Sequence, residues 1–143
     1  MSDFSKNTGR PPRRIVLLGA TGSVGRSTVD LLERDPENFS VTAVAAGRDA
    51  LALADIARRT KAEYAAVRDE SAYGALKEAL AGTNIQVGAG REAVIEAALR
   101  EADLVVSAIV GAAGVEPTHA ALAAGRDVAL ANKECLVCAA FLL

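Results

Sequence analysis

Short apolar runs alternate with longer stretches of helical periodicity along most of this chain. The runs of strand length are Arg14–Gly19, Val41–Gly47, Glu63–Val67, Ile85–Val87, Asp103–Val110 and Asp127–Ala131. The helical stretches are Ser23–Arg34, Ala50–Thr60, Ser71–Ala81, Arg91–Arg100 and Pro117–Ala124. Strict alternation predicts parallel strands joined by right-handed crossovers, with helices on both faces. We therefore expect an α/β fold built on a doubly wound parallel sheet.

Local signals mark the ends of several of these helices. Asp35 and Pro36 end the first helix. Asp49 precedes the second, where its carboxylate can cap the free backbone N–H groups. Gly125 follows the last helix as its C-cap.

Composition and charge narrow the class of protein. Of the 143 residues 51% are apolar and only 3% aromatic, so the core is expected to consist of Ala, Val, Leu and Ile. The net charge of −2 favours neither nucleic acid nor an anionic membrane as a partner. No apolar run approaches the roughly 20 residues of a membrane span. Two cysteines do not make a disulfide framework, so a reduced, cytoplasmic protein is predicted.

The first twelve residues, MSDFSKNTGRPP, contain no apolar segment of the kind found in secretory signals. They predict a flexible leader, residues 1–12, that ends at the Pro11–Pro12 pair. Residues 13–143 contain no internal linker or repeat and are predicted to form one domain.

The stretch GATGSVG follows the first predicted strand and carries three glycines, Gly19, Gly22 and Gly25. In an α/β sheet this turn directs backbone N–H groups and a helix N-terminus at a pyrophosphate. Gly19 would allow the tight turn, Gly22 the approach of the phosphate, and Gly25 close packing of helix and strand. Thr21 and Ser23 add hydroxyl donors. The turn favours a Rossmann-like NAD(P)-binding domain over residues 13–143, although a tight turn without a ligand is the alternative.

The end of the second predicted strand indicates which dinucleotide binds. An acidic residue there accepts from a ribose 2′-hydroxyl, whereas an arginine suits a 2′-phosphate. The sequence is AAGRD, in which Arg48 favours NADP. Asp49 either caps the next helix or repels the phosphate.

Polar residues also follow the last predicted strand, where Asn132, Lys133 and Glu134 come in succession. Ligands bind at this edge of such sheets, so the three side chains can orient a nicotinamide ribose and an anionic substrate. A helix cap by Asn132 is the alternative.

Three other groups of residues are assigned no functional role. Tyr73 and Lys77 have the Tyr-x-x-x-Lys spacing of short-chain dehydrogenases, but they fall on the third helix, where a solvated face is expected. Cys135 and Cys138 form one C-x-x-C, too few ligands for a zinc site, and are read as packing residues. His119 is expected on a helix surface. No catalytic residue and no metal ligand is assigned.

Four segments together resemble the 1-deoxy-D-xylulose 5-phosphate reductoisomerase family: GATGSVG, the AAGR turn, SAIVGAAGVEPT and ALANKECLV. The likeness runs from about Arg13 to Cys138 and corresponds to the N-terminal cofactor domain of that family. The last two segments are highly specific in combination.

The resemblance implies an enzyme of the non-mevalonate isoprenoid pathway that uses NADPH and Mg²⁺ or Mn²⁺ and forms a homodimer at full length. Such an enzyme rearranges and reduces 1-deoxy-D-xylulose 5-phosphate to 2-C-methyl-D-erythritol 4-phosphate. Lys133 would meet this sugar phosphate substrate. The implied NADPH contacts are Thr21, Gly22, Ser23, Val24, Gly47, Arg48, Asp49, Asn132 and Glu134.

The chain departs from the family pattern in three places. Asp49 replaces a usual Asn, which is expected to weaken binding of the 2′-phosphate, and Cys135 replaces a usual Ser. The metal-binding and C-terminal domains are expected to be absent from this chain, which would then be inactive alone. Two other functions stay open: a stand-alone NADP-binding regulatory module, and the cofactor domain of a semialdehyde dehydrogenase with Cys135 as nucleophile.

Overall fold

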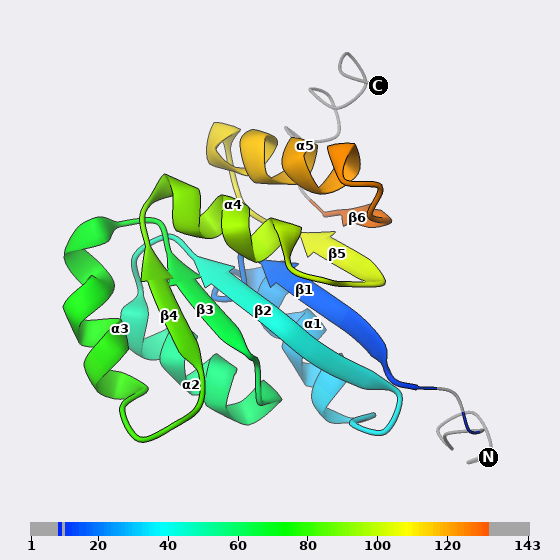
Figure 1. Cartoon of the computed structure of the whole chain (residues 1–143), viewed down its shortest axis with the longest axis horizontal. Helices are drawn as coiled ribbons and strands as arrows, with labels where there is room; N and C mark the ends of the chain where they lie inside the picture. The colour runs from blue at the N-terminus through cyan, green and yellow to red at the C-terminus, as the bar shows by residue number, and fades with distance from the viewer. Residues whose placement is uncertain (1–8, 10, 132–143) are drawn as a thin grey trace.

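The structure is a computed structural model that describes Gly9 and residues 11–131. Within these residues six strands form one parallel sheet in the order β4-β3-β2-β1-β5-β6 (Figure 1). The strands are β1 (Arg13–Leu18), β2 (Phe39–Ala46), β3 (Tyr64–Val67), β4 (Gln86–Ala89), β5 (Leu104–Ser107) and β6 (Val128–Leu130). The helices are α1 (Ser23–Glu33), α2 (Ala50–Thr60), α3 (Tyr73–Ala79), α4 (Arg91–Leu99) and α5 (Val115–Ala123). The predicted doubly wound α/β fold is confirmed.

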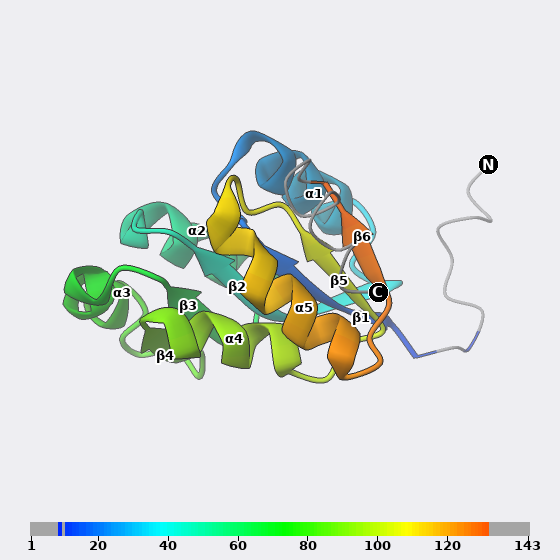
Figure 2. The same cartoon turned by 90° about the horizontal axis from the view of Figure 1, so that it is seen from above.

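The two faces of the sheet bury different sets of side chains because successive residues of a strand point in opposite directions. In β1, Ile15 and Leu17 belong to the core beneath α1, α2 and α3, whereas Val16 and Leu18 belong to the core beneath α4 and α5. Figure 2 shows α1 and α2 on one side of the sheet and α4 and α5 on the other. The small residues expected from the composition, chiefly Ala and Val, make up most of both cores.

Several element bounds differ from the prediction, and the largest difference concerns β5. The predicted strand Asp103–Val110 ends at Ser107, because the chain then turns toward the glycine turn instead of continuing beside β6. The second half of this apolar run, residues 108–110, is a loop. The other strand bounds move by one to two residues at an end.

Two helices also begin differently from the prediction. The stretch predicted as Ser71–Ala81 opens with a 3-10 turn, Glu70–Ala72, before α3. In α5 the helix begins before Pro117, which is acceptable because a proline in the first turn removes no intrahelical hydrogen bond. Gly125, with φ 81°, lies directly after the C-cap Ala124.

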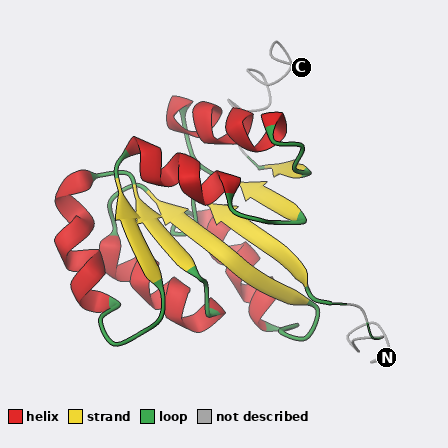
Figure 3. Cartoon of the chain, in the orientation of Figure 1, coloured by secondary structure: helices red, strands yellow, loops and turns green. Residues whose placement is uncertain are grey.

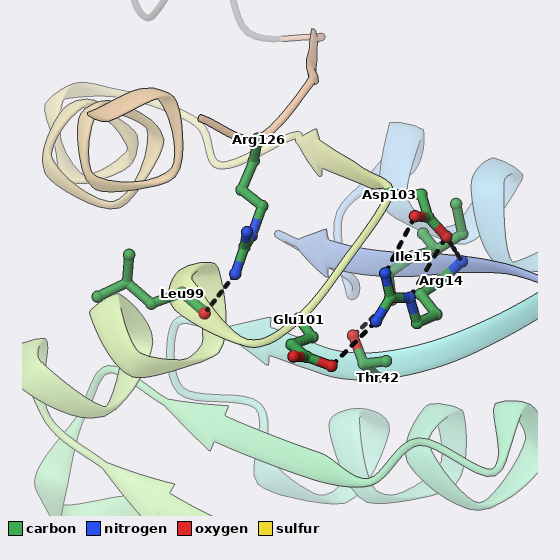
Figure 4. A network of polar contacts seen from close by, with 7 residues as sticks. All are labelled: Arg14, Ile15, Thr42, Leu99, Glu101, Asp103 and Arg126. Atoms are coloured by element: carbon green, nitrogen blue, oxygen red, sulfur yellow. Dashed lines mark hydrogen bonds and ion pairs between the residues drawn. The ribbon is translucent and has the colours of Figure 1, made fainter. Parts of the chain in front are cut away.

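A polar network joins the start of β1 to the loop before β5 at the amino edge of the sheet (Figure 4). Asp103 Oδ2 accepts from the backbone N–H of Arg14 at 2.8 Å, and Asp103 Oδ1 lies 3.2 Å from the Arg14 guanidinium. Glu101 accepts from the same guanidinium at 3.0 Å. Beside it the β1–β2 register shifts after Ile15, and the buried Thr42 hydroxyl donates to the Ile15 carbonyl at 3.3 Å.

Candidate cofactor site

The order of the strands places a binding crevice at the carboxyl ends of β1 and β5. From β1 the chain proceeds outward through β2, β3 and β4, and then returns to the other side of β1 with β5. Open α/β sheets bind ligands where the order reverses, outside the carboxyl ends of the strands. The arrowheads in Figure 3 mark this edge.

The glycine turn between β1 and α1 is packed too tightly for side chains at two positions. Gly19 has φ 83°, and a Cβ there would lie 2.5 Å from the carbonyl carbon and oxygen of Ala108. A Cβ on Gly25 would lie 2.1 Å from the Gly19 carbonyl oxygen. The tight turn expected at Gly19 and the close helix packing expected at Gly25 are therefore present. At Gly22 a Cβ would meet only the Gly19 oxygen, at an ordinary 3.7 Å.

Helix α1 begins directly after this turn with Gly22 at its N-cap and no side-chain cap. The first N–H groups of a helix have no intrahelical partners and carry its positive dipole end. Arg26 donates from Nε to the Thr21 carbonyl oxygen at 2.8 Å, which fixes the turn from the solvent side. The uncapped N-terminus is thus a ready site for an anion.

A hollow of about 260 Å³ lies beside the turn. Its walls come from the glycine turn, from Ala46 at the end of β2 and the adjacent Gly47, from Val94 of α4, and from residues 108–110 and Ala113 after β5. Arg68 is the charged residue that lines it. Small apolar walls with a few directed polar groups suit a nucleotide better than a polar substrate.

Two larger hollows, of about 320 and 420 Å³, lie at the opposite edge of the sheet. One lies among the end of α1, the start of β2 and the end of α2, and the other lies between residues 58–63 and 83–85. Neither contains a helix N-terminus or a glycine turn. Size alone therefore does not identify the site, and the chemistry of the walls favours the hollow at the carboxyl edge.

Asp49 has the capping role that the sequence left open. Its Oδ1 accepts from the backbone N–H of Ala52 at 3.1 Å, at the N-terminus of α2. Arg48 precedes it and forms no hydrogen bond or ion pair through its guanidinium within the described part of the chain. The Ser71 hydroxyl and backbone N–H hold the pKa of Asp69 below its ordinary value, and the nearby Arg48 charge lowers it further.

The loop after β5 is held by a buried pair of hydroxyls. Ser107 Oγ and Thr118 Oγ1 lie 2.6 Å apart, and both residues are buried. They are the first and last residues of the segment SAIVGAAGVEPT. Their contact therefore joins the two ends of the loop and holds α5 against the end of β5. Gly111, with φ 83°, makes the sharp turn between them.

Some of the remaining candidate residues lie in the described part of the chain, and the others lie outside it. Lys77 Nζ lies 5.8 Å from the centre of the Tyr73 ring, and both belong to the surface of α3, away from the crevice. His119 is exposed on α5, as expected. The following predicted residues lie outside the described residues: Asn132, Lys133, Glu134, Cys135 and Cys138.

The described residues contain no group of three or more His, Cys, Asp or Glu side chains that could hold a metal ion. In the same part of the chain, no helix is long and apolar enough to cross a membrane.

The parallel sheet, the glycine turn at the strand reversal and the uncapped helix define a dinucleotide-binding domain of the doubly wound type. Comparison with known proteins gives the particular family. The family model of 1-deoxy-D-xylulose 5-phosphate reductoisomerase matches residues 15–140, and the chain belongs to this family.

Relatives of the same name are close in sequence. The chain is 55% identical over 139 residues to the reductoisomerase of Gluconobacter oxydans, which covers 97% of this chain and 34% of the relative. It is 56% identical over 131 residues to that of Rhodospirillum centenum, covering 92% and 33%. The chain thus spans about a third of the length of these curated relatives. Family membership argues against the semialdehyde dehydrogenase alternative.

Solved structures agree with the sequence matches. The reductoisomerase from Zymomonas mobilis in complex with NADPH superposes with a TM-score of 0.88 at 50% identity, covering 92% of this chain and 35% of that one. A reductoisomerase in complex with magnesium superposes with a TM-score of 0.82 at 35% identity, covering 88% and 32%.

Proposed function

We propose that this chain is the NADPH-binding domain of an enzyme that converts 1-deoxy-D-xylulose 5-phosphate to 2-C-methyl-D-erythritol 4-phosphate. The observation that carries the proposal is the glycine turn with an uncapped helix N-terminus at the strand reversal, in a fold that superposes on an NADPH complex. Catalytic and C-terminal domains would come from outside residues 13–143. A cytoplasmic location and a homodimer at full length stay predictions.

The residues divide by the part of the cofactor that they would hold. The backbone N–H groups of Gly22, Ser23 and Val24 would bind the pyrophosphate, with the Thr21 hydroxyl beside them. Gly47 and Arg48 would hold the adenosine ribose and its 2′-phosphate, with Asp49 beside them capping α2. The remaining predicted contacts, from the segment after β6, are Asn132 and Glu134 to NADPH and Lys133 to the sugar phosphate.

NADPH, when bound, supplies the hydride that reduces the rearranged aldehyde. The described residues contribute binding and orientation: the glycine turn fixes the pyrophosphate, and the loop held by Ser107 and Thr118 bounds the crevice on the side of β5. The described residues do not form a site for Mg²⁺ or Mn²⁺, so we assign the metal of the full-length enzyme no ligand here.

Calorimetric titration of the chain with NADPH and NADH tests the proposal. An arginine–phosphate contact contributes about 1.5–3 kcal/mol, so NADPH should bind about tenfold to a hundredfold more tightly. Equal affinities would contradict the assignment of Arg48.

Asp49→Asn is the matched variant in the same titration. Asparagine keeps the oxygen that caps α2 and removes a negative charge beside Arg48. NADPH should then bind about fivefold more tightly, corresponding to about 1 kcal/mol of Coulomb energy, while NADH changes little. An equal gain for both nucleotides would mean that the substitution acts on the fold instead.

A stand-alone NADP-binding module is the second candidate, and it predicts the same binding. The two differ in the reaction: a module shows no oxidation of NADPH when the sugar phosphate and the remaining domains of a family member are supplied with the chain. Turnover in that mixture would support the first candidate, that the chain is the NADPH-binding domain of the enzyme.

A further inference from the structure

Arg68 follows β3 at the same edge of the sheet as the glycine turn. Its side chain lines the hollow together with Gly19, Thr21, Gly22 and Gly47. It is the charged residue of this lining, in which the other residues are apolar or glycine apart from Thr21.

The backbone places Arg68 beside the turn that carries Arg48. Strands β2 and β3 pair up to Ala46 and Val67, and the hydrogen bonds continue past both strand ends. The Arg68 N–H donates to the Ala46 carbonyl at 2.9 Å, and the Asp69 N–H donates to the Gly47 carbonyl at 2.8 Å. Adjacent strands lie about 4.8 Å apart, so the two arginines start from neighbouring segments at one edge.

Within the described residues both guanidiniums lack hydrogen-bond and ion-pair partners, unlike most of the arginines there. Neither Arg48 nor Arg68 forms a hydrogen bond or ion pair there through its side chain. The charge of Arg68 adds only to the lowering of the Glu116 pKa, for which the Arg91 contact is the larger cause. Arginines that do have such partners are Arg14, Arg26, Arg58, Arg59, Arg91, Arg100 and Arg126.

The two acidic residues of the same turns, Asp49 and Asp69, accept hydrogen bonds from groups other than the two arginines. Asp49 accepts from the backbone of α2, and Asp69 accepts from the Ser71 backbone N–H at 2.9 Å and its hydroxyl at 2.6 Å. One oxygen of each carboxylate, Oδ1, is thus engaged at a helix start, and within the described residues neither carboxylate forms an ion pair with Arg48 or Arg68, although the Arg48 charge helps to lower the pKa of Asp69. A planar guanidinium suits a phosphate because it can donate two parallel hydrogen bonds.

We propose that Arg68 is a second specificity-determining residue for the cofactor and that it binds the adenosine 2′-phosphate together with Arg48. This inference rests on the proposed function, because it requires that a dinucleotide occupies the crevice. Arg48 reaches the phosphate from the end of β2, and Arg68 reaches it from the end of β3 across Gly47. A dianionic phosphate between two unpaired cations also explains how the site tolerates Asp49.

The test compares Arg68→Ala, Arg68→Lys and the control Arg34→Ala in the 143-residue chain. Arg34 follows α1 at the opposite edge, is exposed, and also lacks a side-chain partner among the described residues, so its loss removes the same charge. Calorimetry would measure NADPH, NADH, adenosine 2′,5′-bisphosphate and AMP. Circular dichroism would check that each variant is folded.

Arg68→Ala should weaken NADPH and adenosine 2′,5′-bisphosphate about tenfold and leave NADH and AMP within about twofold. Arg68→Lys should restore part of the loss, and Arg34→Ala should change nothing beyond twofold. Equal losses for all four ligands would overturn the inference, because Arg68 would then contact a group that all four share, the adenine ring or the 5′-phosphate. Unchanged NADPH binding by Arg68→Ala would overturn it as well. A wild-type chain that binds neither dinucleotide would instead refute the proposed function, and this inference with it.

Discussion

At the scale of a single residue, contact with neighbouring backbone atoms determines which amino acid can occupy position 25. Gly25 is the third residue of α1, where alanine would ordinarily be the better helix former. Here an added methyl would meet backbone atoms of Gly19 and Ala20, at 2.1 to 2.7 Å, and backbone cannot rotate away as a side chain can. The position therefore requires glycine for packing, independently of any ligand.

We expect Gly25→Ala to lower the free energy of unfolding by about 1–3 kcal/mol, the usual cost of overpacking. It should also weaken NADPH binding, because the turn must move to relieve the contact. Urea unfolding followed by circular dichroism measures the first effect. Gly74→Ala in α3 is the control, since nothing lies within 4 Å of its added Cβ, and it should stabilise by up to about 1 kcal/mol. Destabilisation of similar size in both variants would contradict the contact argument.

The residues that the sequence identified correctly are those whose roles depend on near neighbours. The cap at Asp49 and the close packing at Gly25 follow from positions within a few residues of a helix start. Arg68 was missed because its place depends on the pairing of β2 with β3, which joins residues far apart in the chain. One signal was available: Arg68 directly follows a predicted strand, as Arg48 does.

At the scale of elements, every predicted strand and helix exists within the described residues, and the errors lie at their ends. Helix α2 has the predicted bounds: the Asp49 cap precedes it as expected, and Lys61, in the left-handed conformation with φ 56°, follows it. Strand β5 was predicted too long because Ala108, Ile109 and Val110 are apolar for a different reason: they line the crevice. Hydrophobicity alone cannot separate a strand from an apolar loop, because Ala108 is buried here whereas Val110 is exposed.

The contact between β1 and β5 gives an element-scale prediction that depends on pH. Hydrogen bonds from the Arg14 guanidinium and the Arg14 backbone N–H hold the pKa of the Asp103 carboxyl below its ordinary value. A carboxyl with a depressed pKa stabilises the fold above its unfolded pKa, about 3.9, and this stabilisation is lost as the pH falls through the lower folded value. Asp103→Asn should therefore be less stable than wild type at pH 7.

The difference in free energy of unfolding between the two proteins should shrink in urea titrations at pH 3. Glu101→Gln is the control, because Glu101 meets the same guanidinium from a highly exposed position, and its loss should cost less than that of Asp103. If the difference in free energy of unfolding between wild type and Asp103→Asn were equal at both pH values, the carboxylate charge would not be the source of the stabilisation.

At the scale of the whole molecule, the strand–helix alternation was enough to predict the sheet and the edge at which the site lies. The alternation could not predict the wall of the crevice on the side of β5. That wall is formed by the loop after β5, which folds back against Gly19. The crevice therefore draws on the turn after β1, the ends of β2 and β3, and a segment some ninety residues later in the chain. These parts meet only in the folded protein.

A ligand that needs all of these parts binds the folded chain and not the unfolded one, so NADPH should raise the melting temperature. A nucleotide at 100 times its Kd stabilises by about 2.7 kcal/mol, which corresponds to a rise of roughly 10 °C for a domain of this size. NADH that binds tenfold more weakly should give about half that rise at the same concentration. Thermal unfolding followed by circular dichroism measures both shifts. If NADPH left the melting temperature unchanged at a concentration where calorimetry shows saturation, it would be binding folded and unfolded chains alike, and the crevice assembled from distant segments would not be its site.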